Sequence, residues 1–421
     1  MYSNMEQKHS EITEFLSDNL FKTQILPRNK LHFSHRSKDF IGKLFNDINQ
    51  SERTYISDNI TATTLNINKD GLPRGQSYSH CPQEIRDEIE SKSKCGFQYM
   101  FNIKDRKFNI VLVSPDKLNT VIPYMKKAIK NIYMWLYVAS QYAKPKCSEQ
   151  MNVYIYLTGL SKMLPEKEAT ISQMHANTAF TTSCQTQTEV HVFRREEWFK
   201  TFIHETFHNM GMDFSAYDNT LINNEMYTIF PVNTDFRLYE SYCEMWGETM
   251  AILFNVHRSM RRNTKVEDIQ DRIPNMIKSV EAAIIQEAYH ALFQVSKILS
   301  HYGLTYDELI KNNMGQNGCS YKEDTPVLSY FVIKSILIYN IDEFLQWCIH
   351  NNGSSLNFTN LLSNDEIQAK MKRYCGIAKK HYKDEDYIDI LSEIQHIYKG
   401  IKPIRKNRYI LQNLRMTITE P

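Results

Sequence analysis

Short stretches rich in β-branched and aromatic residues alternate with helical spacing between residues 100 and 200. Residues 107–115, 152–160 and 188–194 have the composition of strands. Residues 115–143 follow the first of them with apolar side chains every three or four positions, which predicts a long helix. A strand followed directly by a helix is typical of the start of an α/β layer.

Helical patterns dominate the rest of the chain. Residues 195–212 have helical spacing and end at Gly211, a residue that favours helix termination. Residues 235–260 carry a second apolar face, and the chain from about residue 262 onward is mostly helical in pattern. We therefore predict an α+β fold that is mostly helical, with a small mixed sheet beside a central helix and a helical C-terminal lobe.

The length of the chain favours more than one packed lobe, because 421 residues exceed most single cores. Residues 1–104 mix short helical patterns with turn-rich segments, and we predict an N-terminal lobe without a recognisable motif. Residues 105–260 contain the three predicted strands and the predicted helices at residues 195–212 and 235–260, and we predict that they form the core of the protein. Residues 261–421 are predicted to form the helical lobe, which ends in a basic tail.

The charge balance argues against a nucleic-acid partner. Fifty Lys and Arg residues against 48 Asp and Glu residues give a formal net charge of +2, whereas nucleic-acid-binding proteins carry a strongly basic surface. No segment approaches the roughly 18 consecutive apolar residues of a membrane span. The first residues lack a basic segment followed by an apolar core, so we expect no secretory signal.

The eight cysteines are widely scattered, without a Cys-x-x-Cys pair or the short spacings of a zinc finger or a disulfide framework. We interpret all of them as reduced thiols, which together with the missing secretory signal predicts a cytoplasmic location. They are Cys81, Cys95, Cys147, Cys184, Cys243, Cys319, Cys348 and Cys375.

One motif indicates a specific chemistry. Residues 204–208 read His-Glu-Thr-Phe-His, and on a helix two histidines four positions apart lie on the same face. His204 and His208 could therefore bind one zinc ion, while Glu205 reaches a water molecule beside it. The simpler alternative is an amphipathic helix with two polar histidines. The preceding strand and the following Gly211 favour the metal site.

A catalytic zinc ion needs a third protein ligand and an open fourth position. One family of zinc proteases takes this ligand six residues after the second histidine, but that position is Phe214, and Asp213 is one residue early. The other source is a later helix, where Glu240, Glu244 and Glu248 stand at successive helical turns. A solvated helix face is the alternative interpretation of these three residues.

The segment Glu240-Ser241-Tyr242-Cys243-Glu244-Met245-Trp246-Gly247 resembles the glutamate helix of gluzincins, the thermolysin-like zinc peptidases. This resemblance implies that Glu240 binds the zinc ion and that Glu244 accepts a hydrogen bond from the free ring nitrogen of His204. Small residues such as Gly247 would let the two helices approach closely. Glu244 in place of Glu240 as the third ligand stays open.

Residues 150–255 are also similar to uncharacterised metallopeptidase-like proteins of large cytoplasmic DNA viruses. The similarity is carried by the segment "NTAFTTSCQTQTEVHVFRREEWFKTFIHETFHNMGMDFS". It implies a protein of the infected cell or the virion, whose substrate is unproven.

The resemblance to gluzincins implies hydrolysis of peptide bonds. Glu205 would act first as a base towards the attacking water and then as an acid towards the leaving amine. The tetrahedral oxyanion needs a donor, for which Tyr330, His301 and Tyr302 are the candidates. A peptide or protein substrate is expected to bind as an extra strand at the sheet edge, along residues 175–182 or 188–194.

Two other functions compete with a peptidase. A structural or virion-associated protein could use zinc only to brace the fold, but such sites close all four positions and usually include cysteine. Cys243 lies on the right helix, although we expect it to face away from a ligand at Glu240. Alternatively, the basic tail at residues 399–415 could bind an acidic partner, such as a protein of the virion or the cell, or a nucleic acid.

Overall fold

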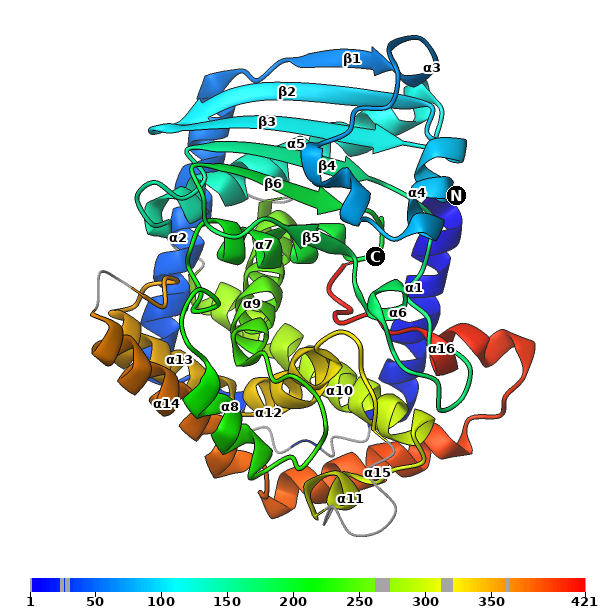
Figure 1. Cartoon of the computed structure of the whole chain (residues 1–421), viewed down its shortest axis with the longest axis vertical. Helices are drawn as coiled ribbons and strands as arrows, with labels where there is room; N and C mark the ends of the chain where they lie inside the picture. Colours follow the sequence, from blue (N-terminus) through cyan, green and yellow to red (C-terminus); the bar gives the residue numbers. More distant parts are fainter. Residues whose placement is uncertain are drawn as a thin grey trace.

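The computed structural model describes residues 2–22, 26, 31–261, 273–311, 321–359 and 363–420. Six strands form one mixed sheet in the order β1-β2-β3-β4-β6-β5 (Figure 1). The pairs β3–β4 and β4–β6 are parallel and the other neighbours are antiparallel. The three predicted strands are confirmed as β3, β4 and β6. The strands are β1 (Ala62–Asn66), β2 (Cys95–Ile103), β3 (Arg106–Ser114), β4 (Gln150–Tyr156), β5 (Ala179–Thr181) and β6 (Gln187–Val192).

The remaining described elements are mostly helices, so the predicted mostly helical α+β fold is confirmed. Two short π-helical and two 3-10 segments accompany them. They are α1 (Tyr2–Leu16), η1 (Ser17–Phe21), α2 (His35–Asp58), α3 (Ile67–Asp70), η3 (Gln76–His80), α4 (Gln83–Lys92), α5 (Leu118–Tyr142), α6 (Gln173–Ala176), α7 (Trp198–Asn209), α8 (Thr220–Tyr227), α9 (Leu238–Arg261), α10 (Ile273–His301), α11 (Tyr306–Lys311), η5 (Leu328–Ile333), α12 (Lys334–Tyr339), α13 (Ile341–Asn352), α14 (Asn364–His381), α15 (Glu385–Gly400), η6 (Arg405–Asn407) and α16 (Arg408–Gln412).

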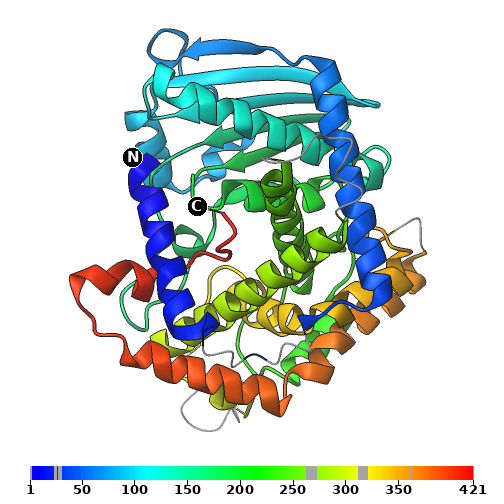
Figure 2. The same ribbon diagram turned by 180° about the vertical axis from the view of Figure 1, so that it is seen from behind.

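Strand β3 is apolar at consecutive positions because both faces of the sheet are covered. Ile110 and Leu112 point into the main core, on the face where α5 crosses the sheet beside α2 (Figure 2). Val111 and Val113 point to the opposite face, into a smaller cluster that α4 covers with Ile85. The alternation of side chains along a strand thus supplies both cores from a single apolar run.

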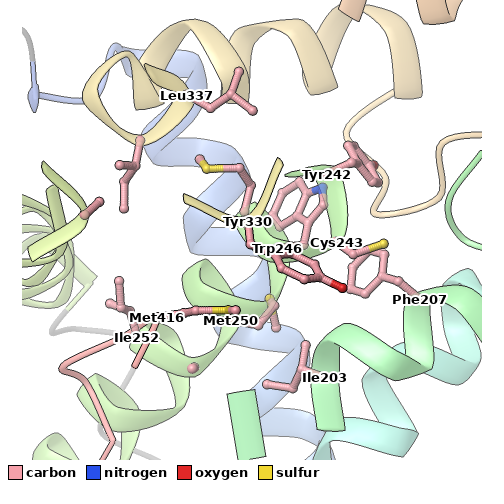
Figure 3. Close-up of a cluster of buried hydrophobic side chains, with 14 of the residues drawn as sticks. Ile203, Phe207, Tyr242, Cys243, Trp246, Met250, Ile252, Tyr330, Leu337 and Met416 are labelled. Carbon is pink, nitrogen blue, oxygen red and sulfur yellow. The ribbon is translucent and has the colours of Figure 1, made fainter. Parts of the chain in front are cut away.

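Helix α7 packs against α9, and this contact brings the two halves of the candidate site together. Gly247 of α9 makes the approach possible, since a Cβ atom there would lie 3.3 Å from the carbonyl oxygen of Lys200 and 3.5 Å from Cβ of His204. Figure 3 shows Ile203 and Phe207 of α7 in one apolar cluster with residues of α9. The close approach expected from the small residues of the glutamate helix is therefore present at Gly247.

Distant segments of the sequence interleave in space. The predicted boundary at residue 104 falls between β2 and β3, which pair along their full length, so residues 1–104 contribute two strands to the sheet. The end of the chain returns to the centre of the molecule (Figure 1), where Leu414 and Thr417 are fully buried. Residues 402–406 of the basic tail are exposed, but Arg415 is buried. None of the described helices is long and apolar enough to cross a membrane.

The prediction that all cysteines are reduced is wrong for two of them. Cys147 and Cys184, 37 residues apart, form a disulfide that joins the segment before β4 to the loop between β5 and β6. Spacing along the sequence gave no sign of this pair, since the fold alone brings the two positions together. Cys319 lies outside the described residues. Five cysteines are free and buried: Cys81, Cys95, Cys243, Cys348 and Cys375.

Candidate metal centre

Helix α7 carries the His-Glu-x-x-His motif through the interior of the protein. It ends at Asn209, and the predicted terminator Gly211 follows two residues later with a φ of +65°, a left-handed conformation that glycine adopts at little cost. At the other end, the carboxylate of Glu420 accepts hydrogen bonds from the backbone N–H groups of Phe199 and Lys200, each at 3.2 Å. Acceptors at a helix N-terminus satisfy N–H groups that have no partner within the helix.

Three potential ligand atoms converge between α7 and α9. Nε2 of His204 lies 3.1 Å from Nε2 of His208 and 3.0 Å from Oε2 of Glu240, and the third separation, from His208 to Glu240, is 3.3 Å. Around a tetrahedral zinc ion with bonds of 2.0–2.1 Å, ligand atoms lie about 3.3–3.4 Å apart. One of the three separations reaches this value and two are slightly shorter, so the three atoms are close enough together to share one ion.

Carboxylates hold the other ring nitrogen of each histidine. Nδ1 of His204 lies 2.8 Å from Oε1 of Glu244, and Nδ1 of His208 is bonded to Oδ2 of Asp213. With the ring protons on Nδ1, both Nε2 atoms present lone pairs towards each other and towards Glu240. Carboxylates that hold the outer ring nitrogen in this way also occur behind metal-binding histidines.

The electrostatics of this cluster favour a positive charge at its centre. Burial lowers the pKa of His204, but Glu240 and Glu244 outweigh this effect and raise the pKa to about 8. Burial raises the pKa of Glu240, but the two histidines dominate and hold it at about 2. Lys200 forms a buried ion pair with Glu244, which keeps that carboxylate charged and in place.

Glu205 is directed towards a cavity of about 330 Å³ beside the cluster. Its side chain is almost fully buried, and burial raises its pKa, while His204 and His208 oppose this effect. The cavity also reaches Tyr330 of η5, whose ring centroid lies 6.0 Å from that of His204. A cavity of this size lies at the lower end of the range found for ligand-binding sites.

One wall of the cavity is the edge strand β5. Ala179, Phe180 and Thr181 line the cavity, and among the described strands β5 pairs only with β6. Its outer edge can therefore accept an additional strand. The expected edge at residues 175–182 is the one that adjoins the site, whereas residues 188–194 contain the inner strand β6.

The alternative interpretations of the two helices do not fit the structure. Glu240, Glu244 and Glu248 are 8%, 3% and 1% exposed, so they do not form a solvated face. Glu248 pairs with Lys334 away from the two histidines. His204 and His208 belong to a helix that is buried on all sides, which excludes an ordinary amphipathic surface helix.

Two of the three candidates for the oxyanion donor lie elsewhere. Nε2 of His301 lies 2.8 Å from the carbonyl oxygen of Ala169, and the hydroxyl of Tyr302 donates to the carbonyl oxygen of Lys322. The structure does not bring either residue to the cavity. The helical pattern of the sequence covers His301 and Tyr302, at the end of α10 and just after it, but such a pattern does not show which side chains face the site. Only Tyr330 reaches the cavity.

Sequence reasoning missed the part played by Asp213. The sequence pattern places Asp213 one residue out of register for a zinc ligand, whereas in the structure its carboxylate is bonded to Nδ1 of His208. Cys243 lies on the same side, with Sγ 3.5 Å from Oδ2 of Asp213 and 3.8 Å from Nδ1 of His208. Cys243 thus lies on the Nδ1 side of the His208 ring, whereas Glu240 lies on its Nε2 side. Gly211 is the feature of the sequence that could have indicated the contact between Asp213 and His208, because a tight turn there folds the next residues back onto the helix.

No family model, curated protein or solved structure shows a significant match to the chain.

Proposed function

We propose that this protein is a zinc-dependent metallopeptidase of the gluzincin type, with His204, His208 and Glu240 as the metal ligands. The observation that carries this proposal is the spacing of their three ligand atoms, 3.0 to 3.3 Å, which is close enough for them to share one zinc ion. The carboxylates behind both histidines support it further. Glu244 is then the partner of His204 rather than a ligand.

A zinc ion in this site would supply Lewis acidity that activates water and polarises a carbonyl group. Glu205 is next to the three proposed ligands but forms no hydrogen bond with them, and its carboxylate borders the cavity. It takes the proton of the attacking water and delivers it to the leaving nitrogen, which breaks the peptide bond. Its raised pKa suits both transfers, because the group must accept and then release a proton.

Tyr330 is the residue best suited to stabilise the oxyanion. Burial raises the pKa of its phenol well above the usual value, so the hydroxyl keeps its proton and donates. A peptide bound along β5 would cross the cavity in front of Glu205, where its scissile carbonyl comes within reach of both side chains. The substrate class that fits is thus an extended peptide or an unfolded protein segment.

A zinc-braced structural protein, possible for a virion component, is the competing function. It would need a fourth protein ligand, and among the described residues no further His, Cys, Asp or Glu joins the set of His204, His208 and Glu240. The side of the cluster next to Glu205 opens instead into the cavity. A viral origin, a cytoplasmic location and a protein partner for the exposed part of the basic tail stay predictions.

Replacement of Glu205 by Gln tests the proposal, because the side chain keeps its shape but loses the base. We expect zinc content to stay near that of wild type while cleavage of a peptide library falls by about 10²–10⁴-fold. Tyr330→Phe should lower kcat more than it changes KM. Tyr239→Phe is its matched control, since Tyr239 is the other tyrosine among the described residues lining the cavity. Equal cleavage by wild type and Glu205→Gln would overturn the mechanism.

A further inference from the structure

One cation borders the proposed substrate cavity. Arg237 is the only Lys or Arg residue among the described side chains that line it. It stands immediately before α9, and its carbonyl oxygen accepts a hydrogen bond of 3.0 Å from the backbone N–H of Glu240. Arg237 is therefore about one helical turn from a proposed zinc ligand, within the same cavity.

The guanidinium group of Arg237 is held in place but only partly used. Its Nε atom lies 3.1 Å from Oδ2 of Asp235, and the two side chains are 46% and 69% exposed. An ion pair this exposed contributes little to stability, about 0–1 kcal/mol. Among the described residues, no acceptor forms a hydrogen bond with either terminal nitrogen of Arg237. These two nitrogens form the planar fork that binds a carboxylate with two parallel hydrogen bonds.

Nearby carboxylates do not cancel the charge of Arg237. Glu323 is largely buried and already accepts hydrogen bonds from Thr234, Tyr321 and the backbone of Leu328. Asp324, which also lines the cavity, forms no ion pair with Arg237. Burial lowers the pKa of Arg237, but Tyr239, Asp235 and Glu240 outweigh this effect and raise it, so the side chain stays charged.

We propose that Arg237 binds a carboxylate of the peptide substrate and gives this cavity its specificity. The inference rests on the proposed peptidase function and deepens it. Because Arg237 is one turn, about 5 Å, from Glu240, and an extended peptide advances about 3.4 Å per residue, the carboxylate lies within about three residues of the scissile bond. It belongs either to an Asp or Glu side chain or to the C-terminus of the substrate.

The two sources of the carboxylate can be separated by peptide binding to the zinc-loaded Glu205→Gln protein. Three randomised, N-acetylated peptide pools serve as probes. The first lacks Asp and Glu and is amidated, the second contains one fixed Glu and is amidated, and the third lacks Asp and Glu but has a free C-terminal carboxylate. The half-saturation concentration of each pool is measured on immobilised protein, so the readout does not depend on turnover.

One of the two carboxylate pools should bind at least tenfold more tightly than the neutral pool. A preference for the second pool identifies a side chain and therefore cleavage within chains, whereas a preference for the third identifies the C-terminus and carboxypeptidase activity. Combining Glu205→Gln with Arg237→Gln should abolish the preference. Arg237→Lys should keep only part of it, because lysine retains the charge but not the fork.

Arg405→Gln is the matched control, since Arg405 is an exposed arginine of η6 that does not line the cavity. It should leave the preference unchanged. Equal binding of all three pools, or a preference that persists in Arg237→Gln, would overturn the inference while leaving the proposed function intact. If no pool binds to protein that holds zinc, the proposed function fails together with the inference.

Discussion

Replacement of Asp213 by Asn isolates the contribution of the carboxylate behind His208. Oδ2 of Asp213 accepts the Nδ1 proton of His208, while Oδ1 accepts hydrogen bonds from the backbone N–H and the hydroxyl of Ser215 at 3.2 and 2.8 Å. Asn has only one oxygen for these two tasks. If its NH₂ group turns towards Nδ1, the ring must move its proton to Nε2, the atom that we propose as the metal ligand.

The expected loss follows from this single contact. A hydrogen bond to a charged acceptor contributes about 1.5–3 kcal/mol, and the loss of such a partner weakens metal binding about 10–100-fold. We therefore predict that Asp213→Asn raises the zinc Kd by one to two orders of magnitude, or about 1.4–2.7 kcal/mol. The assay is competition with a chromophoric zinc chelator at a fixed pH.

The matched control is Ser215→Ala, which removes a donor to Oδ1 and leaves the contact with His208 intact. Its zinc Kd should stay within about twofold of wild type. An Asp213→Asn protein that is folded and binds zinc as tightly as wild type would refute the assignment of Asp213 as the partner of His208.

Three further predictions concern stability. Without reductant, Cys184→Ser should lower the free energy of unfolding in denaturant by about 4 kcal/mol, since the disulfide closes a 37-residue separation. Reduced wild type should lose the same amount, and an unchanged denaturant midpoint in Cys184→Ser would contradict the prediction. In the same assay, Gly211→Ala should lower the free energy of unfolding more than Gly353→Ala does. Both glycines have a left-handed φ, but only at Gly211 would a Cβ atom meet Sγ of Cys147, at 2.9 Å. Equal losses in the two variants would count against this contact. Burial lowers the pKa of His290 to about 4, so the unfolded chain binds the proton first and stability falls by roughly 3 kcal/mol as the pH drops from about 6.5 to 4. Thermal unfolding of His290→Gln should depend less on pH in that window, and an identical slope would contradict the prediction.

The sequence predicted those features that depend on local spacing. Two histidines four positions apart share a helix face, and Glu240 and Glu244 one turn apart on α9 meet that face in the expected order. Strands β3, β4 and β6 were visible because β-branched runs are rare in helices. The histidine pair and the strands are predicted from residues that are neighbours along a single element, whereas the order of Glu240 and Glu244 is what the resemblance to gluzincins implies.

The features that were missed depend on contacts between distant segments. The disulfide of Cys147 and Cys184 requires the β5–β6 hairpin to fold back beside the segment before β4. Glu420 reaches α7 only because the end of the chain passes through the core, 220 residues away from Lys200 in sequence. No local pattern carries such information, since it arises from the packing of complete elements.

Zinc per chain, measured by elemental mass spectrometry after identical dialysis, tests the central assignment most directly. Wild type, Glu240→Ala and Glu244→Ala would be compared as folded proteins. We predict about one zinc ion in wild type, its loss in Glu240→Ala, and weakened retention in Glu244→Ala, because Glu240 supplies a ligand atom whereas Glu244 only holds His204. A folded wild-type protein without zinc, or a Glu240→Ala protein that retains it fully, would contradict the account.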